Sequence, residues 1–356
     1  MRSANTVGVR QGATRTGIDA RLDLTGAISG TVTCGPDDKP LAACWITAYC
    51  KVGTAWEPYY GAVTGVDGTY SLTSLTPGTY KLEFYDSSGV YVSEFYNAQP
   101  TLAKATSVAV RAGATTGDIN GTLDVGGRIS GTVTSAADKS PVAGAWVNVY
   151  QLVGSSWLWI NGGEAADNGQ YAVGGLRTGV CKVEFLDESG ALAWEFYDGK
   201  STLAKATPVS VRMGHETPNI NATLDPGGAI SGKVTSAADN SPAVGMIVVV
   251  YRLTSGSVWE PFNYAETGSD GHYTLGGLRT GNYKIEFFDP YGTCASEFYD
   301  NKPTLVRANQ VGVIVGTTTA NVNAALDLLS SSMFSTSRRL PDSVLSPYAR
   351  ARSMRM

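Results

Sequence analysis

The chain has 356 residues, of which 43% are hydrophobic and 16% charged, and its formal net charge is -4 at pH 7. This apolar fraction is typical of folding domains, and the length is enough for two or three of them. A slightly acidic chain is not typical of nucleic-acid-binding proteins, which neutralise phosphates with a Lys/Arg excess. No stretch approaches the roughly 18 apolar residues that cross a bilayer, so we predict no membrane span.

The segment at the start of the chain, residues 1–25, matches the end of a unit that returns later. Val9-Arg10 stands 101 residues before Val110-Arg111. We therefore expect residues 1–25 to be the last two strands of a truncated preceding module, and the chain to be a fragment of a longer repeat protein. Docking of this strand pair onto another chain by strand addition is the alternative.

Three copies of one unit follow. Gly-Ala-Ile-Ser-Gly at residues 26–30 returns as Gly-Arg-Ile-Ser-Gly at 127–131 and as Gly-Ala-Ile-Ser-Gly at 228–232, at intervals of 101 residues. A Glu-Phe-Tyr triplet that begins at Glu94, Glu195 and Glu297 accompanies them. A fixed period of this kind indicates repeated structural units. We expect three modules: residues 26–125 (module 1), 126–226 (module 2) and 227–327 (module 3).

Each module is predicted to be an all-β sandwich of about seven or eight strands. In Tyr80-Lys81-Leu82-Glu83-Phe84 apolar and charged residues alternate, which places them on opposite faces of a strand. We expect the lysines of this strand, Lys81, Lys182 and Lys284, to point to solvent and to screen Glu83, Glu184 and Glu286. Asp-Gly and Asn-Gly pairs between strands suit hairpins. With seven strands the two ends of a module lie at opposite poles, which predicts a rod; with eight they do not.

The repeat ends after Leu326-Asp327. Residues 328–356 carry five arginines and one aspartate and show no consistent periodicity. We expect a disordered basic tail there.

The order of motifs resembles the carboxypeptidase regulatory-like module across residues 4–327. The motifs are Ile-Ser-Gly-Thr-Val-Thr, then Val-x-Val-Tyr, then Asp-Gly-x-Tyr-x-Leu, then Gly-x-Tyr-Lys. That module is an immunoglobulin-like, transthyretin-like or prealbumin-like sandwich of the starch-binding-like fold, related to B-type repeats of Gram-positive collagen adhesins. The resemblance implies a secreted or surface-exposed bacterial protein, and it implies no peptidase activity.

The same resemblance raises one covalent possibility. Some adhesin repeats carry an internal Lys-to-Asn isopeptide bond. Only module 3 has a lysine at the matching place on its first strand, Lys233, with Asn321 or Asn323 as acceptor, whereas modules 1 and 2 have Thr31 and Thr132.

The sequence predicts no catalytic residue, no metal site and no cofactor. His215 and His272 are expected in exposed turns, since neither recurs between modules. The Asp67, Asn168 and Asp270 turns lack the spaced oxygen ligands of a calcium loop. The five cysteines follow no pattern. For Cys34 and Cys44 a local disulfide is one alternative, and burial as small apolar residues is the favoured one.

Aromatic residues are the best remaining functional signal. On the second strand of each module the alternation turns Trp45 with Tyr49, Trp146 with Tyr150, and Tyr251 outward, and such a stripe is a platform on which sugar rings stack. The alternative is that these rings cover polar neighbours. Trp56, Trp157 and Trp259, on the next strand, are expected in the core.

We conclude from the sequence that this is a non-catalytic extracellular or cell-surface repeat protein, a stalk or adhesive scaffold. Its expected partners are polysaccharide or extracellular matrix and surface proteins. The alternative function is that of carbohydrate-binding accessory modules of a secreted, amylase-like glycoside hydrolase whose catalytic domain lies outside this chain.

Overall fold

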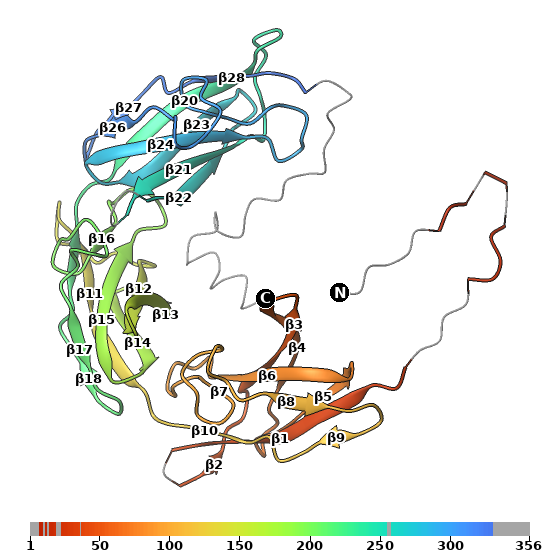
Figure 1. Cartoon of the computed structure of the whole chain (residues 1–356). Coiled ribbons are helices and arrows are strands. Elements are labelled where there is room, and N and C mark those ends of the chain that lie inside the picture. The colour runs from red at the N-terminus through yellow and green to blue at the C-terminus, as the bar shows by residue number, and fades with distance from the viewer. Residues whose placement is uncertain are drawn as a thin grey trace. The chain divides into compact units, whose positions relative to one another are not determined.

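The computed structural model describes residues 7–9, 11–12, 14–18, 23–35, 37–254 and 258–329. Within them every regular element is a β-strand, and the strands form three consecutive pairs of sheets (Figure 1), which confirms the prediction of tandem all-β sandwich modules. Two compact units divide the chain, one ending at Gly126 and the other beginning at Gly127, so modules 2 and 3 share a unit. The expected disordered tail lies, from residue 330, outside the described residues.

Module 1 contains two five-stranded sheets. One is built around β1, which pairs with β2, β5, β9 and β10, and the other has the order β4-β3-β6-β7, with β8 also paired to β6. The strands are β1 (Gly26–Cys34), β2 (Lys39–Pro40), β3 (Trp45–Val52), β4 (Ala55–Val63), β5 (Thr69–Leu75), β6 (Gly78–Tyr85), β7 (Glu94–Phe95), β8 (Val108–Val110), β9 (Thr115–Thr116) and β10 (Gly121–Leu123).

Modules 2 and 3 repeat this plan without a counterpart of β2 among the strands that the structure describes. Those of module 2 are β11 (Gly127–Ser135), β12 (Trp146–Val153), β13 (Ser156–Glu164), β14 (Gln170–Leu176), β15 (Gly179–Leu186), β16 (Glu195–Phe196), β17 (Val209–Val211), β18 (Glu216–Thr217) and β19 (Ala222–Leu224). Those of module 3 are β20 (Gly228–Ser236), β21 (Ile247–Leu253), β22 (Trp259–Glu266), β23 (His272–Leu278), β24 (Gly281–Phe288), β25 (Glu297–Phe298), β26 (Val311–Val313), β27 (Thr318–Thr319) and β28 (Ala324–Leu326).

The core of each module lies between its two sheets. In module 1 the inward residues of β1, β5 and β6, among them Ile28, Leu72 and Phe84, are fully buried. The period-two alternation seen in the sequence places them on one face of each strand. Burial of each such side chain stabilises the fold by about 1.5–3 kcal/mol.

The first strand of each module changes partners along its length. The first half of β1 pairs with β5 and, in parallel, with β9, whereas residues 32–34 pair in parallel with β10. The chain therefore enters the module at one end of β1 and leaves it beside the other end. At about 3.3 Å per residue, a nine-residue strand separates these two points by roughly 27 Å.

Between β9 and β10, hydrogen bonds made by side chains hold the chain beside β1. The Asn120 Oδ1 atom accepts a hydrogen bond from the Thr31 backbone N–H (2.9 Å), and the Tyr70 hydroxyl donates to the Ile119 carbonyl oxygen (2.6 Å). A Cβ atom on Gly30 would lie 2.1 Å from that same carbonyl oxygen, so glycine is required. The arrangement recurs at Asn221, Tyr171 and Gly131 and at Asn323, Tyr273 and Gly232, which gives a structural reason for three of the repeated motifs.

The repeated Asp-Gly turn is present, but the expected hairpin is wrong. The turn before β5 joins β4 to β5, and these strands belong to different sheets. Gly68 has φ 74°, and a Cβ atom there would lie 2.5 Å from the Val32 carbonyl oxygen. The Asp67 carboxylate accepts from the Thr69 backbone N–H (3.1 Å), as expected for a turn.

The N-terminal segment does not form the expected strand pair at its described positions. Residues 7–9 and 14–18 carry no strand, and Val9 and Ile18 are exposed. Their counterparts in module 1, β8 and β9, are held by pairing with β6 and β1 of the same module. A strand needs such a neighbour, and the described residues supply none to this segment.

Candidate functional site: the outer face of the second sheet

The repeated lysine is buried, so the prediction that it points to solvent is wrong. Lys81 is 7% exposed, and its Nζ donates to the carbonyl oxygens of Leu102 (2.7 Å) and Ala103 (2.9 Å). The segment between β7 and β8 folds back over β6, and an ammonium group supplies the donors that its carbonyls need. Lys182 and Lys284 make the same two bonds in their modules.

The tryptophan of the next strand covers this lysine, so the prediction that it lies in the core is also wrong. Lys81 Nζ lies 5.0 Å from the centroid of the Trp56 ring, and Trp157 and Trp259 hold Lys182 and Lys284 in the same way (4.6 and 5.0 Å). A cation over a tryptophan face is stabilising, and more so when it is partly desolvated.

The repeated glutamate binds a tyrosine on the outer face, and the expected Lys–Glu screening is not the arrangement found. The Tyr49 hydroxyl donates to Glu83 Oε2 (2.6 Å), Tyr150 to Glu184 (2.9 Å), and Tyr251 to Glu286. Burial raises the pKa of Glu83 above its ordinary value, although the bond from Tyr49 lowers it. Each module thus carries a carboxylate on its outer face that a tyrosine positions.

Among the aromatic residues expected to form sugar platforms, Trp45 alone has a widely open ring, with 50% exposure. Trp146 is 3% exposed and its Nε1 donates to Asn148 Oδ1 (2.9 Å), an atom that also accepts from Trp159 Nε1 (2.9 Å). Tyr150 is also buried, and Tyr49 and Tyr251 are half-buried. The expected outward exposure of Trp146 and Tyr150 is therefore wrong.

Module 3 covers this face of module 2. The Arg252 Nη1 atom, on β21, donates to Glu184 Oε1 on β15 (2.7 Å). The guanidinium lies beside two neighbouring rings: its carbon is 4.5 Å from the centroids of both Trp194 and Phe262, which are 5.3 Å from each other. Because Glu184 is only 1% and the Arg252 side chain 14% exposed, the pair is largely removed from water.

A second arginine binds the neighbouring strand. Arg279 donates to Glu195 Oε2 (3.5 Å), to the Trp194 carbonyl oxygen (3.3 Å) and to the Gly199 carbonyl oxygen (3.3 Å). Burial raises the pKa of Glu195, and the nearby Arg279 partly reverses this. Burial alone would lower the pKa of Arg252, but Glu184, Tyr150 and Glu260 together more than offset it, so the pKa of Arg252 lies above its ordinary value.

The apolar core continues through this interface. Tyr150, Trp194, Phe196 and Ala206 of module 2 belong to the same buried cluster as the core of module 3. The backbones also meet, because a Cβ atom on Gly276 would lie 2.5 Å from the Gly190 carbonyl oxygen. Modules 2 and 3 therefore join by packing, by a buried ion pair and by a glycine contact.

Sequence reasoning missed the interface arginines. Arg252 stands where modules 1 and 2 have Cys50 and Gln151, so a search for repeated residues passes over it. One signal was available: modules 2 and 3 carry Gly-Gly at 174–175 and 276–277, where module 1 has Thr73-Ser74.

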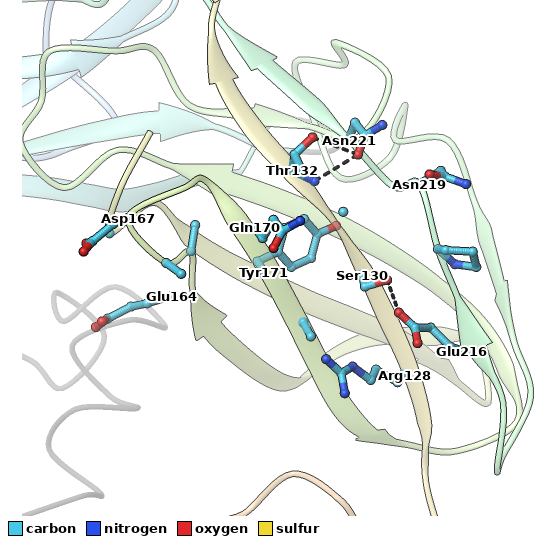
Figure 2. A pocket seen from close by; sticks show the side chains of 16 residues that line it. Arg128, Ser130, Thr132, Glu164, Asp167, Gln170, Tyr171, Glu216, Asn219 and Asn221 are labelled. Atoms are coloured by element: carbon cyan, nitrogen blue, oxygen red, sulfur yellow. Dashed lines mark hydrogen bonds between the residues drawn. The ribbon is translucent and has the colours of Figure 1, made fainter. Parts of the chain in front are cut away.

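A polar cleft of about 800 Å³ lies on the other sheet of module 2. The Ser130 hydroxyl donates to Glu216, and the Thr132 backbone N–H and hydroxyl both bind Asn221 Oδ1 (Figure 2). Arg128 and Glu216 stand opposite each other on the paired strands β11 and β18. Modules 1 and 3 have alanine and threonine at these two positions, so the charges belong to module 2 alone.

The remaining predicted residues are placed as follows. His215 and His272 are exposed, as predicted, but His272 is the first residue of β23 and does not lie in a turn. The Cys34 and Cys44 thiols are free and buried, so the disulfide alternative is wrong. Asn323 accepts from the backbone N–H of Lys233 (2.8 Å), and the isopeptide bond stays a prediction. Among the described residues no group of three or more His, Cys, Asp or Glu could hold a metal ion, and no helix could span a membrane.

No family model and no curated protein matches the chain. One similar solved structure is the Bacillus anthracis TIE protein, with 11% identity over 85% of this chain and 51% of that chain and a TM-score of 0.25. Another is a streptococcal ancillary pilin, with 11% identity over 86% of this chain and 99% of that chain and a TM-score of 0.27. A minor pilin of Streptococcus agalactiae is also similar, with 12% identity over 60% of this chain and 98% of that chain and a TM-score of 0.27. The chain spans about half the length of the first of these proteins. A likeness at this level assigns no function.

Proposed function

We propose that this protein is a non-catalytic extracellular repeat scaffold, a surface stalk or adhesive spacer in which successive sandwich modules are held in a fixed relation. The observation that carries the proposal is the interface between modules 2 and 3. A largely buried arginine on one module binds a buried glutamate on the other, beside two neighbouring aromatic rings.

The joint between these modules is short and bonded. β19 ends at Leu224 and β20 begins at Gly228. Within it the Gly227 N–H donates to the Ala191 carbonyl oxygen (2.7 Å), and the Ala193 N–H donates to the Asp225 carbonyl oxygen (2.8 Å). Each such bond contributes about 1 kcal/mol net. A short bonded linker together with a packed interface transmits force and limits bending, which is what a stalk requires.

The finer assignment is to tandem carboxypeptidase regulatory-like modules on a bacterial surface, with surface or matrix proteins as partners. The order of motifs supports it, and so does the role of each motif: Ile-Ser-Gly and Asp-Gly-x-Tyr hold the crossing of the last strands over the first. A polysaccharide-binding role has less support, because Trp45 alone among the five aromatic residues has a widely open ring.

Surface labelling tests the proposal. Intact cells that express the complete gene encoding this chain should be labelled by an antibody against residues 127–329. Protease added outside the cells should remove this signal. Signal that appears only after lysis would contradict a surface role. In parallel, polysaccharide pull-down with Trp45→Ala as the variant tests the sugar platform: equal binding of parent and variant rules it out.

A further inference from the structure

Module 3 repeats the face on which module 2 receives its arginine. Tyr251 binds Glu286 as Tyr150 binds Glu184. The Tyr251 and Phe298 ring centroids are 6.0 Å apart at 52°, against 6.2 Å and 50° for Tyr150 and Phe196. The tyrosine, glutamate and phenylalanine of the acceptor are therefore preserved, whereas Ser296 stands in the place of Trp194.

The two faces differ in what covers them. Glu184 and Phe196 in module 2 are 1% and 2% exposed, because module 3 lies on them, whereas Glu286 and Phe298 are half-buried. Glu297 takes the place of Glu195. With the Asn301 amide oriented so that its nitrogen faces Glu297, that carboxylate accepts a hydrogen bond from it. No Lys or Arg among the described residues forms an ion pair with Glu297.

The charge on this face is unbalanced. Burial, and the nearby Asp327, raise the pKa of Glu297 to about 7. In module 2 the corresponding Glu195 has Arg279 beside it. A guanidinium group is therefore the ligand that this face lacks, since it matches a carboxylate and stacks on aromatic rings.

The chain itself leads toward this face. Cys294 is bridged to Leu328, and the Leu329 N–H donates to the Thr293 carbonyl oxygen (2.8 Å), only a few residues before β25. Residues 330–356 then supply five arginines against one aspartate. Arg338 lies nine residues beyond Leu329, a reach of up to about 30 Å at ~3.3 Å per residue.

We propose that an arginine of the C-terminal segment 330–356 docks on the module 3 face formed by Tyr251, Glu286, Glu297 and Phe298, as Arg252 docks on module 2. The tether gives this arginine a millimolar effective concentration. The segment then covers this face of module 3 and competes with any arginine-bearing module of a second molecule. The inference rests on the proposed scaffold function and extends it to the outer face of module 3.

Three forms of the protein test it: the full chain, the chain ending at Leu329, and the full chain with Arg338, Arg339, Arg350, Arg352 and Arg355 changed to Gln. The carboxyl carbon of Glu297 is titrated by NMR in each. We expect its pKa to be about one to three units lower in the full chain than in the other two, as an adjacent arginine produces. Synthetic peptide 330–356, added to the chain ending at Leu329, should restore the shift, and 1 M salt should weaken it.

Equal Glu297 pKa values in all three forms overturn the proposal. A shift that survives the five Arg→Gln changes also overturns it, because the segment would then bind without its guanidinium groups. The Glu184 and Glu195 signals of module 2 serve as the internal control and should be identical throughout. The scaffold proposal depends on modules 2 and 3 tumbling together in solution, which this titration does not measure. A negative result for Glu297 therefore does not contradict the scaffold proposal.

Discussion

Replacing Arg252 with alanine is the sharpest test of the interface between modules 2 and 3. The change leaves the Glu184 carboxylate buried without its cation. Removal of one partner from a buried ion pair costs about 3–5 kcal/mol. Glu184 keeps two donors, the Tyr150 hydroxyl (2.9 Å) and the Asn148 amide (3.2 Å), so we expect the lower end, about 3 kcal/mol.

Because the pair joins two modules, the loss falls on their coupling. In a repeat array, stability is the sum of module terms and interface terms. We expect modules 2 and 3 to unfold in one calorimetric transition in the parent chain and in two in Arg252→Ala. Arg128→Ala, at an exposed arginine on the other sheet of module 2, is the matched control and should change stability by less than about 0.5 kcal/mol. An Arg252→Ala chain that unfolds like the parent would refute the reasoning.

Three further predictions follow from single contacts. Gly276→Ala should separate modules 2 and 3, because the new Cβ atom would lie 2.5 Å from the Gly190 carbonyl oxygen. Gly281→Ala is the control and should leave the modules joined, because its new Cβ atom would have no atom nearer than 3.9 Å. A change in interdomain tumbling in both variants, or in neither, would contradict this. Asn221→Ala should lower the free energy of unfolding by about 1 kcal/mol in chemical denaturation, since the Thr132 N–H loses its acceptor, and an unchanged midpoint would count against that bond. In the chain ending at Leu329, thermal stability should fall as pH rises from about 4.5 to about 7. The reason is that the raised pKa of Glu297 lets the folded state bind more protons than the unfolded state in that pH range. Glu297→Gln should abolish this pH dependence.

The fold was predictable because its signals repeat. Alternation on β6 identifies Leu82 and Phe84 as core residues, and the 101-residue period fixes how the motifs correspond between modules. The same alternation misled for Lys81. It shows that a side chain lies on the outer face of the sheet, but it cannot show that a later segment folds back over that face and turns its carbonyls toward the ammonium group.

The interface was not predictable from the repeat, for a different reason. The interface uses the repeated Glu184, but the residue that binds it does not recur: Arg252 has no arginine counterpart in module 1 or module 2. Trp146 shows the same limit: its ring nitrogen donates to Asn148, which is Thr47 in module 1 and Val249 in module 3. The Gly276-Gly277 pair was a visible trace of close approach between backbones, since a Cβ atom on Gly276 would lie 2.5 Å from the Gly190 carbonyl oxygen.

The most direct test of the central claim is the rotational diffusion of modules 2 and 3, measured from backbone ¹⁵N relaxation and residual dipolar couplings of the full chain. A coupled scaffold predicts a single alignment tensor for residues 127–329. Two independent tensors, one for each module, would show that the Arg252–Glu184 interface does not hold the modules together in solution, and would contradict the account.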